Sequence, residues 1–191
     1  MPPEDAFQPL QEVINSLSSK KSSPLFQPHI TLLSLAPSHL DNYRTALPPQ
    51  LPSAIPVQYE AVQAGSTYFQ SILIKINYSS SDSNVLRKVY EDTLKWTAET
   101  GIGRDTSFIK GGADGSVMLE YNPHLSLFYG DLGTSEKQEL IADMQKQGHV
   151  VPEDGKVTVA GKNGFDVKEV WIVRTEGPID DWKILEKITL G

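Results

Sequence analysis

The sequence contains no cysteine among its 191 residues. A disulfide framework, a zinc–cysteine site, an iron–sulfur cluster and a thiolate nucleophile are therefore all excluded. Basic residues are also scarce, with 17 Lys and Arg against 24 Asp and Glu and a formal net charge of −7. Tight binding to a long nucleic acid normally needs many Lys and Arg contacts to phosphates, so we expect no stable complex of that kind. A small anionic ligand in a locally positive pocket is still allowed.

Long apolar runs are missing as well. The longest, at residues 30–35 and 71–76, have the length of strands and contain polar residues, which predicts no membrane span. The chain begins Met-Pro-Pro-Glu-Asp, whereas a signal peptide has a basic start and then an apolar stretch. We therefore expect an intracellular, soluble protein that is cytoplasmic by default.

The apolar pattern predicts a mixed α+β chain that forms one domain over residues 1–191. Helical spacing is found at residues 6–18, 39–46, 85–96 and 134–147, with a further helical turn at 180–185. Strand-like segments occupy residues 29–35, 57–64, 68–77, 117–121, 124–129, 156–160, 165–175 and 187–190. Asp82 or Ser83 is expected to cap the third helix. The glycine-containing loops at 101–104 and 110–115 lack the spacing of a phosphate-binding loop.

Two of the four histidines lie in nearly duplicate contexts, PHITL at residues 28–32 and PHLSL at residues 123–127. Alternate side chains of a strand point to the same face, so His29 shares a face with Thr31, and His124 shares a face with Ser126. Two strand-edge histidines, each with a local hydrogen bond, would also fit the bare pattern. The prolines and leucines around both pairs argue against coincidence and favour a functional duplication.

These motifs resemble the two His-x-Thr/Ser motifs of the 2H phosphoesterase superfamily. In the forms HITLLSL and HLSLFYG they are similar to those of fungal and plant cyclic nucleotide phosphodiesterases. Residues 170–175 and the pair Asp181-Trp182 resemble the closing strand and helix of that family. The resemblance covers nearly the whole chain in motif order and spacing. It implies two αβ lobes related by pseudo-twofold symmetry, each with an antiparallel sheet and helices, whose motifs face each other across a central cleft.

Paired histidines suit the opening of a cyclic phosphate. One group must take a proton from the attacking water, and another must protonate the departing ribose oxygen on the opposite side of phosphorus. Imidazoles with pKa values near 6.5 do both near neutral pH. The hydroxyls of Thr31 and Ser126 can donate to the phosphoryl oxygens and hold the phosphate in line. The sequence offers no His, Asp and Glu cluster with the spacing of metal ligands, so we expect neither a metal nor another cofactor.

The resemblance also implies roles and substrates. It makes His29 the general base and His124 the general acid, which the residues alone do not distinguish. It places Tyr129 against the phosphate or a bound water, although an ordinary strand aromatic is the alternative. It implies release of nucleoside 2′-phosphates, and it adds ADP-ribose 1″,2″-cyclic phosphate, a by-product of tRNA splicing, as a natural substrate. Fungal relatives have been associated with the Golgi, but no residue here encodes that address.

Three functions stay open on the sequence. The leading hypothesis is a metal-independent phosphodiesterase, monomeric by default, that acts on small cyclic phosphates. The second is an enzyme of the same fold that processes RNA ends, as in 2′–5′ ligase-like or RNA-trimming relatives. The third is a binding module that senses a phosphorylated nucleotide without turnover.

For several other residues the sequence allows more than one role. Tyr68 and Phe69 either stack on a base or simply pack within a strand. Lys75 or Lys110 could lend positive potential to an anionic substrate, and nothing in the sequence selects between them. We expect His39 to be a solvated surface histidine.

Overall fold

The computed structural model describes residues 1–78, 84–103, 105 and 121–191, and these confirm the α+β class. The α-helices are α1 (Glu4–Lys21), α2 (Val85–Glu99) and α3 (Thr134–Lys146), with shorter 3₁₀-helices η1 (Pro37–Ala46), η2 (Tyr68–Gln70) and η3 (Ile179–Asp181). The strands are β1 (Ile55–Ala64), β2 (Ile72–Ile76), β3 (His124–Phe128), β4 (Val150–Glu153), β5 (Lys156–Val159), β6 (Gly164–Val167), β7 (Glu169–Arg174) and β8 (Lys183–Thr189).

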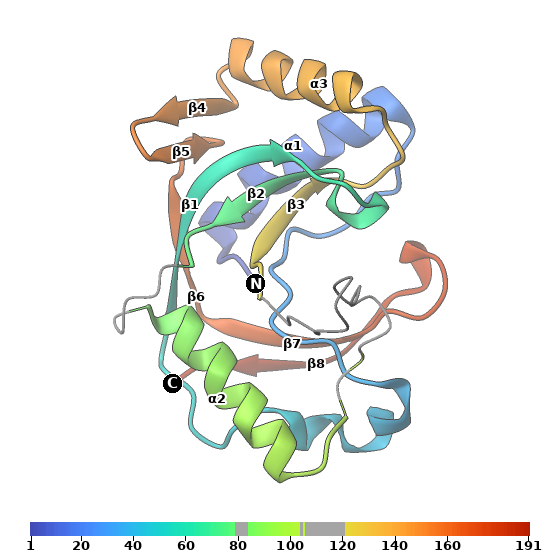
Figure 1. The fold of residues 1–191 in the computed structure, drawn as a ribbon, viewed down its shortest axis with the longest axis vertical. Helices are drawn as coiled ribbons and strands as arrows, with labels where there is room; N and C mark the ends of the chain where they lie inside the picture. Colours follow the sequence, from blue (N-terminus) through green and yellow to red (C-terminus); the bar gives the residue numbers. More distant parts are fainter. Residues whose placement is uncertain (79–83, 104, 106–120) are drawn as a thin grey trace, which may run out of the picture.

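A curved antiparallel sheet carries the main core. Its strand order is β3-β2-β1-β6, and α1 and α3 pack against it (Figure 1). Alternate residues of β1 are buried, as expected for a strand with one face on a core. Aliphatic side chains from both helices and from the inner face of the sheet meet there, among them Leu10, Ile14, Leu17, Ile74, Ile76, Leu125, Leu140 and Met144. Each such burial contributes roughly 1.5–3 kcal/mol before entropy is subtracted.

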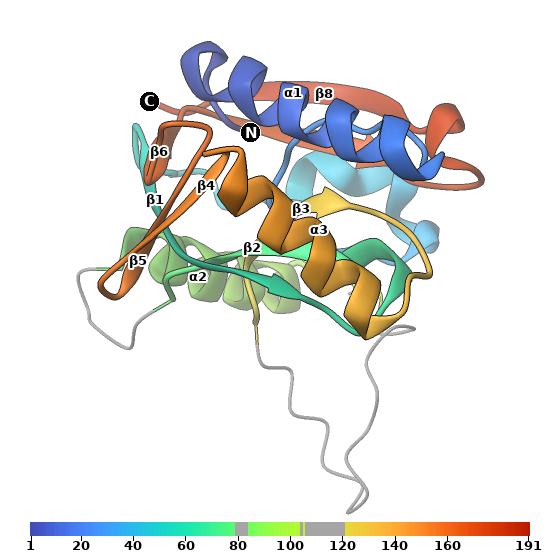
Figure 2. The same ribbon diagram turned by 90° about the horizontal axis from the view of Figure 1, so that it is seen from above.

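The strands β7 and β8 form a separate antiparallel hairpin. In Figure 1 this hairpin crosses the molecule between the end that holds α3 and the end that holds α2, and Figure 2 shows the same elements from above. An ion pair between Arg44 and Glu186 joins η1 to β8, and the Trp96 indole joins α2 to η1 through the Thr45 carbonyl. The hairpin therefore belongs to the framework around η1 and α2.

Several expected elements differ in form. The segment expected as a strand at residues 29–35 makes only an isolated bridge, from Ile30 to Leu125, to another described strand. The helix expected at 39–46 is the 3₁₀-helix η1, and the long strand expected at 165–175 divides into β6 and β7, which join different sheets. The strand β4 was not anticipated.

Asn84 caps α2, since its side chain accepts a hydrogen bond from the Arg87 backbone N–H at 3.0 Å. The expected caps Asp82 and Ser83, the loop at 110–115 and residues 117–120 of the expected strand lie outside the described residues. Within the part of the chain that the structure describes, no helix combines the length and the apolar character needed to cross a bilayer.

Candidate active site

The two histidine motifs lie side by side. The bridge between Ile30 and Leu125 is antiparallel. Residues directly opposite each other in an antiparallel pair have side chains on the same face. The four polar residues of the motifs therefore share one face, with His29 opposite Ser126 and Thr31 opposite His124. The intervening Leu125 is fully buried on the other face.

Both imidazoles are held in the same way by the backbone that precedes them. The Nδ1 atom of His29 lies 2.7 Å from the Gln27 carbonyl oxygen, and that of His124 lies 2.9 Å from the Asn122 carbonyl oxygen. A carbonyl oxygen only accepts hydrogen bonds, so each Nδ1 must carry the hydrogen. The Nε2 atoms are left for proton transfer, as an acceptor when the ring is neutral and as a donor when it is charged.

His29 has the electrostatic setting of a neutral imidazole. Burial lowers its pKa below the ordinary value of 6.5, and the nearby His124 lowers it further, while the hydrogen bond to the Gln27 carbonyl acts in the opposite direction. Burial has the largest effect because the charged form loses its hydration. The lowered pKa favours the neutral, basic form of His29.

On the shared face Ser126 is buried, and its neighbours include the aromatic residues Phe69 and Tyr129. Its hydroxyl donates to the Phe69 carbonyl oxygen at 2.8 Å. The ring of Tyr129 is stacked on Phe26, with centroids 3.7 Å apart, and belongs to the core. Burial raises the pKa of the Tyr129 hydroxyl, and a hydrogen bond with the Ser126 side chain opposes that rise. Tyr129 therefore reaches the shared face through Ser126.

Thr31 is exposed, and its main chain is fixed by a tyrosine. The Tyr121 hydroxyl donates to the Thr31 carbonyl oxygen at 3.1 Å. The Tyr121 ring is stacked on Tyr90 with centroids 3.9 Å apart and an interplanar angle of 8°. This contact connects the chain just before β3 with the first motif, and so it couples the two segments that carry the histidines.

Lys75 lies next to the motifs on the same face, because it is the strand partner of His124. The other lysine considered from the sequence, Lys110, lies outside the described residues. The Lys75 side chain forms an ion pair with Glu60.

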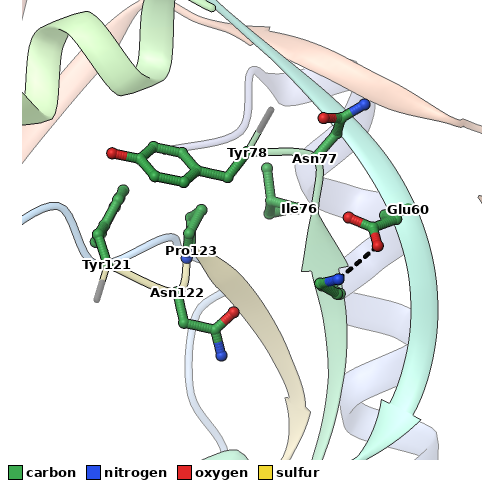
Figure 3. Close-up of a pocket in the computed structure, with 8 residues that line it drawn as sticks. Glu60, Ile76, Asn77, Tyr78, Tyr121, Asn122 and Pro123 are labelled. Carbon is green, nitrogen blue, oxygen red and sulfur yellow. Dashed lines mark hydrogen bonds and ion pairs between the residues drawn. The ribbon is translucent and has the colours of Figure 1, made fainter. Parts of the chain in front are cut away.

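A pocket of about 420 Å³ opens beside this ion pair (Figure 3). Its lining residues are Glu60, Lys75, Ile76, Asn77, Tyr78, Tyr121, Asn122 and Pro123. Of these, only Lys75 was singled out from the sequence as a residue near a substrate. The pocket depends on strand register, which a single sequence does not reveal.

Two other residues considered from the sequence, Phe69 and His39, lie in different environments. Phe69 is 51% exposed, and its ring centroid lies 6.3 Å from that of Trp182. His39 is half-buried, and its Nε2 accepts a hydrogen bond from the Gly103 N–H at 2.8 Å, so the expectation of a solvated histidine is wrong. A neutral ring that accepts at Nε2 has a structural role between η1 and the turn after α2.

The described residues contain no group of three or more His, Asp or Glu side chains that could hold a metal ion. The shared face offers two imidazoles and two hydroxyls, with the Lys75 ammonium beside them. Such a set can move protons to and from oxygen atoms and can hydrogen-bond an anion.

Comparison with known proteins shows the family of the chain. The family model of cyclic phosphodiesterase-like proteins matches residues 1–190. A curated relative, the 2′,3′-cyclic-nucleotide 3′-phosphodiesterase of Neurospora crassa, is 22% identical over 171 residues, which cover 86% of this chain and 78% of the relative. The predicted enzyme class and the resemblance to the 2H phosphoesterase superfamily are confirmed. The chain belongs to the cyclic phosphodiesterase-like family and is an enzyme of that type.

Proposed function

We propose that this enzyme hydrolyses nucleoside 2′,3′-cyclic phosphates to nucleoside 2′-phosphates without a metal ion. One observation carries the proposal: the two imidazoles share a face, and each has its Nδ1 bonded to the carbonyl of the residue two positions earlier. That arrangement leaves two Nε2 atoms for one substrate. The name of the Neurospora crassa relative supports the same substrate class.

The proposed reaction uses each histidine once. The Nε2 of His29 takes a proton from water while the water oxygen bonds to phosphorus. On the opposite side the bond from phosphorus to the 3′ oxygen breaks, and protonated His124 gives its Nε2 proton to that oxygen. The lowered pKa of His29 supports its role as the base. Proton exchange with solvent then restores both rings.

The hydroxyl groups are proposed to hold the phosphate. Thr31 and Ser126 donate to the non-bridging oxygens, where negative charge increases in the transition state. Ser126 donates to the Phe69 carbonyl in the free enzyme, so its hydroxyl must rotate when the phosphate binds. Tyr129 is proposed to contact the phosphate or a bound water, and its hydrogen bond with Ser126 supports that position.

The family resemblance extends the proposal in two directions. ADP-ribose 1″,2″-cyclic phosphate, which would be opened to ADP-ribose 1″-phosphate, is a further proposed substrate, and it would connect the enzyme to by-products of tRNA splicing. A two-lobed fold with pseudo-twofold symmetry is also proposed. An antiparallel pair has a local twofold axis, and the bridge from Ile30 to Leu125 would relate one motif to the other about that axis.

The direct test is hydrolysis of adenosine 2′,3′-cyclic phosphate with EDTA present, followed by identification of the product isomer. We expect undiminished turnover and adenosine 2′-phosphate as the product. Formation of the 3′-phosphate would mean that the other ester bond breaks, and loss of turnover in EDTA would contradict a metal-free reaction. Binding without any product would favour the binding module. Faster cleavage of an oligonucleotide that ends in the same cyclic phosphate would favour RNA-end processing.

A further inference from the structure

We propose that the pocket beside His124 binds the nucleobase of the substrate, an inference that rests on the proposed function. At about 420 Å³ the pocket lies within the range of roughly 300–1,000 Å³ typical of small-molecule sites. Its walls combine aromatic rings with charged and amide side chains. That mixture suits a flat heterocycle with polar edges.

The pocket adjoins the two histidine motifs through its lining residues. Lys75 is the strand partner of His124, and the Asn122 carbonyl accepts the His124 Nδ1 hydrogen bond. On the other side the Tyr121 hydroxyl donates to the Thr31 carbonyl. These lining residues are therefore direct neighbours of residues proposed to contact the phosphate. A base in this pocket would be attached to a ribose whose cyclic phosphate lies next to His124.

An ion pair forms the polar side of the pocket. Glu60 is the extra residue of a β-bulge, where Tyr59 pairs with Ile76 and Ala61 pairs with Lys75. Bulges near sites of chemistry commonly redirect a side chain. Here the bulge brings the Glu60 carboxylate to the Lys75 ammonium, and the two side chains stay 39% and 38% exposed.

This pair favours an uncharged occupant. The ammonium offers donors and the carboxylate offers acceptors, while their charges cancel. A nucleobase presents donors and acceptors side by side along its edge and carries no charge. A second phosphate group would be attracted by Lys75 but repelled by Glu60. The pocket is therefore better matched to the base than to another anionic part of a substrate.

Two tyrosines form the aromatic side. Tyr78 and Tyr121 meet edge to face with centroids 5.1 Å apart, and both are labelled on one side of the pocket in Figure 3, across from Glu60 and Asn77. The stack of Tyr121 on Tyr90 holds this wall in place. Stacking on aromatic rings accepts any base, because every base has a π-face.

Phe69 is the competing position for the base. It precedes β2, while Lys75 lies near the end of that strand, so the two positions are on opposite sides of the proposed phosphate site. Phe69 offers an exposed ring next to Trp182. Among the described residues, Trp182 offers a buried indole N–H beside this ring, but no ion pair involves either residue, so the paired donor and acceptor of the pocket favour the pocket.

The test compares a substrate that has a base with one that lacks it. The two are adenosine 2′,3′-cyclic phosphate and the 2,3-cyclic phosphate of methyl riboside, and kcat/KM is measured for each. We expect Lys75→Met and Glu60→Gln to lower the ratio of the two values about tenfold, the effect of losing one hydrogen bond to a charged group. Phe69→Ala is the control and should leave the ratio unchanged.

A change in the ratio separates base binding from a structural or electrostatic role, since the latter would alter both substrates equally. Equal loss on both substrates would overturn the proposal, as would a selective loss in Phe69→Ala. Calorimetric binding of adenosine 2′-phosphate and methyl riboside 2-phosphate gives the same comparison without turnover. An enzyme that cleaves neither substrate would contradict the proposed function, and the binding series would still decide whether the pocket takes a base.

Discussion

His29 and His124 owe their orientation to the peptide that precedes each of them. Each Nδ1 bonds a carbonyl oxygen two residues earlier, and a proline separates that carbonyl from the histidine. Proline fixes its own φ near −65° and restricts the residue before it. The duplicated Pro-His sequence therefore sets the tautomer of both rings as well as their direction.

The pH dependence of kcat/KM should show the lowered pKa of His29. A base works only when neutral, so activity falls as the pH drops through its pKa. Since burial holds that pKa below 6.5, we expect the acid limb of the profile to have an apparent pKa below 6.5. The same shift means that His29 stabilises the fold above pH 6.5 and that this stability is lost as the pH falls. An acid limb above 6.5 would contradict the assignment of His29 as the base.

Substitutions of Thr31 can separate the effect of its hydroxyl on catalysis from the effect of its side-chain shape. Thr31→Val removes the hydroxyl but keeps the branched side chain, and we expect kcat to fall about 10²–10³-fold, as for the loss of one donor to a developing oxyanion. Thr31→Ser should retain most of the activity. Because Thr31 is exposed, thermal unfolding should change little in either variant. Equal activity in the Thr31→Val and Thr31→Ser variants would contradict a role of the Thr31 hydroxyl in binding the phosphate.

At the scale of elements, the site depends on three neighbouring segments. Strand β2 supplies Lys75, β3 supplies His124 and Ser126, and the bridged segment before η1 supplies His29 and Thr31. The Tyr121 hydroxyl connects the last of these to the chain that enters β3. The loss of that bond should loosen the first motif relative to the second.

Two tyrosine variants test this connection as a matched pair. Tyr121→Phe removes a hydroxyl that bonds the Thr31 carbonyl, and we expect it to lower the free energy of unfolding by about 1 kcal/mol and to reduce kcat/KM. Tyr59→Phe removes a buried hydroxyl that has no hydrogen-bond partner among the described residues, so it should be neutral or stabilising. Denaturant unfolding measures both effects. A destabilised Tyr59→Phe together with an unchanged Tyr121→Phe would contradict this reading.

Some helices and strands could be predicted from the sequence, whereas others could not. The helix starting at Thr134 and the strand at His124 follow from local signals, namely a hydroxyl residue that can start the helix, a glycine after its end, and an alternation of polar and apolar residues. The division of residues 165–175 into β6 and β7 depends on partners distant in the sequence, as does the bridge at Ile30.

The same distinction applies to the site. The His and hydroxyl residues could be found from their duplicated motif, whereas Glu60 could not, because a bulge places it. The single-domain organisation, the monomeric state and the cellular compartment stay predictions.

At the scale of the whole molecule, the net charge of −7 disfavours the binding of substrates that carry many negative charges. A small cyclic phosphate carries one negative charge, while an oligonucleotide carries one on every phosphate. Repulsion from an acidic surface therefore grows with the length of the substrate, and salt screens it over about 8–10 Å at 0.1–0.15 M.

Salt should consequently reveal a preference for small substrates. We expect kcat/KM for adenosine 2′,3′-cyclic phosphate to exceed that for an oligonucleotide ending in the same group at low ionic strength. The difference should narrow as salt is added, because screening removes the repulsion of the longer chain. Rate measurements at 0.02 and 0.2 M NaCl would show this. An oligonucleotide rate that falls with salt would indicate attraction instead, and it would favour RNA-end processing.

The central claim is that His29 and His124 act on one phosphate. The most direct measurement is kcat for adenosine 2′,3′-cyclic phosphate in the variants His29→Ala and His124→Ala. The control is His149→Ala, which replaces an exposed histidine that follows α3 in the sequence. We predict losses of about 10²–10⁴-fold for each of the first two variants and unchanged turnover for the control. Turnover within a fewfold of wild type in either His29→Ala or His124→Ala would contradict the account.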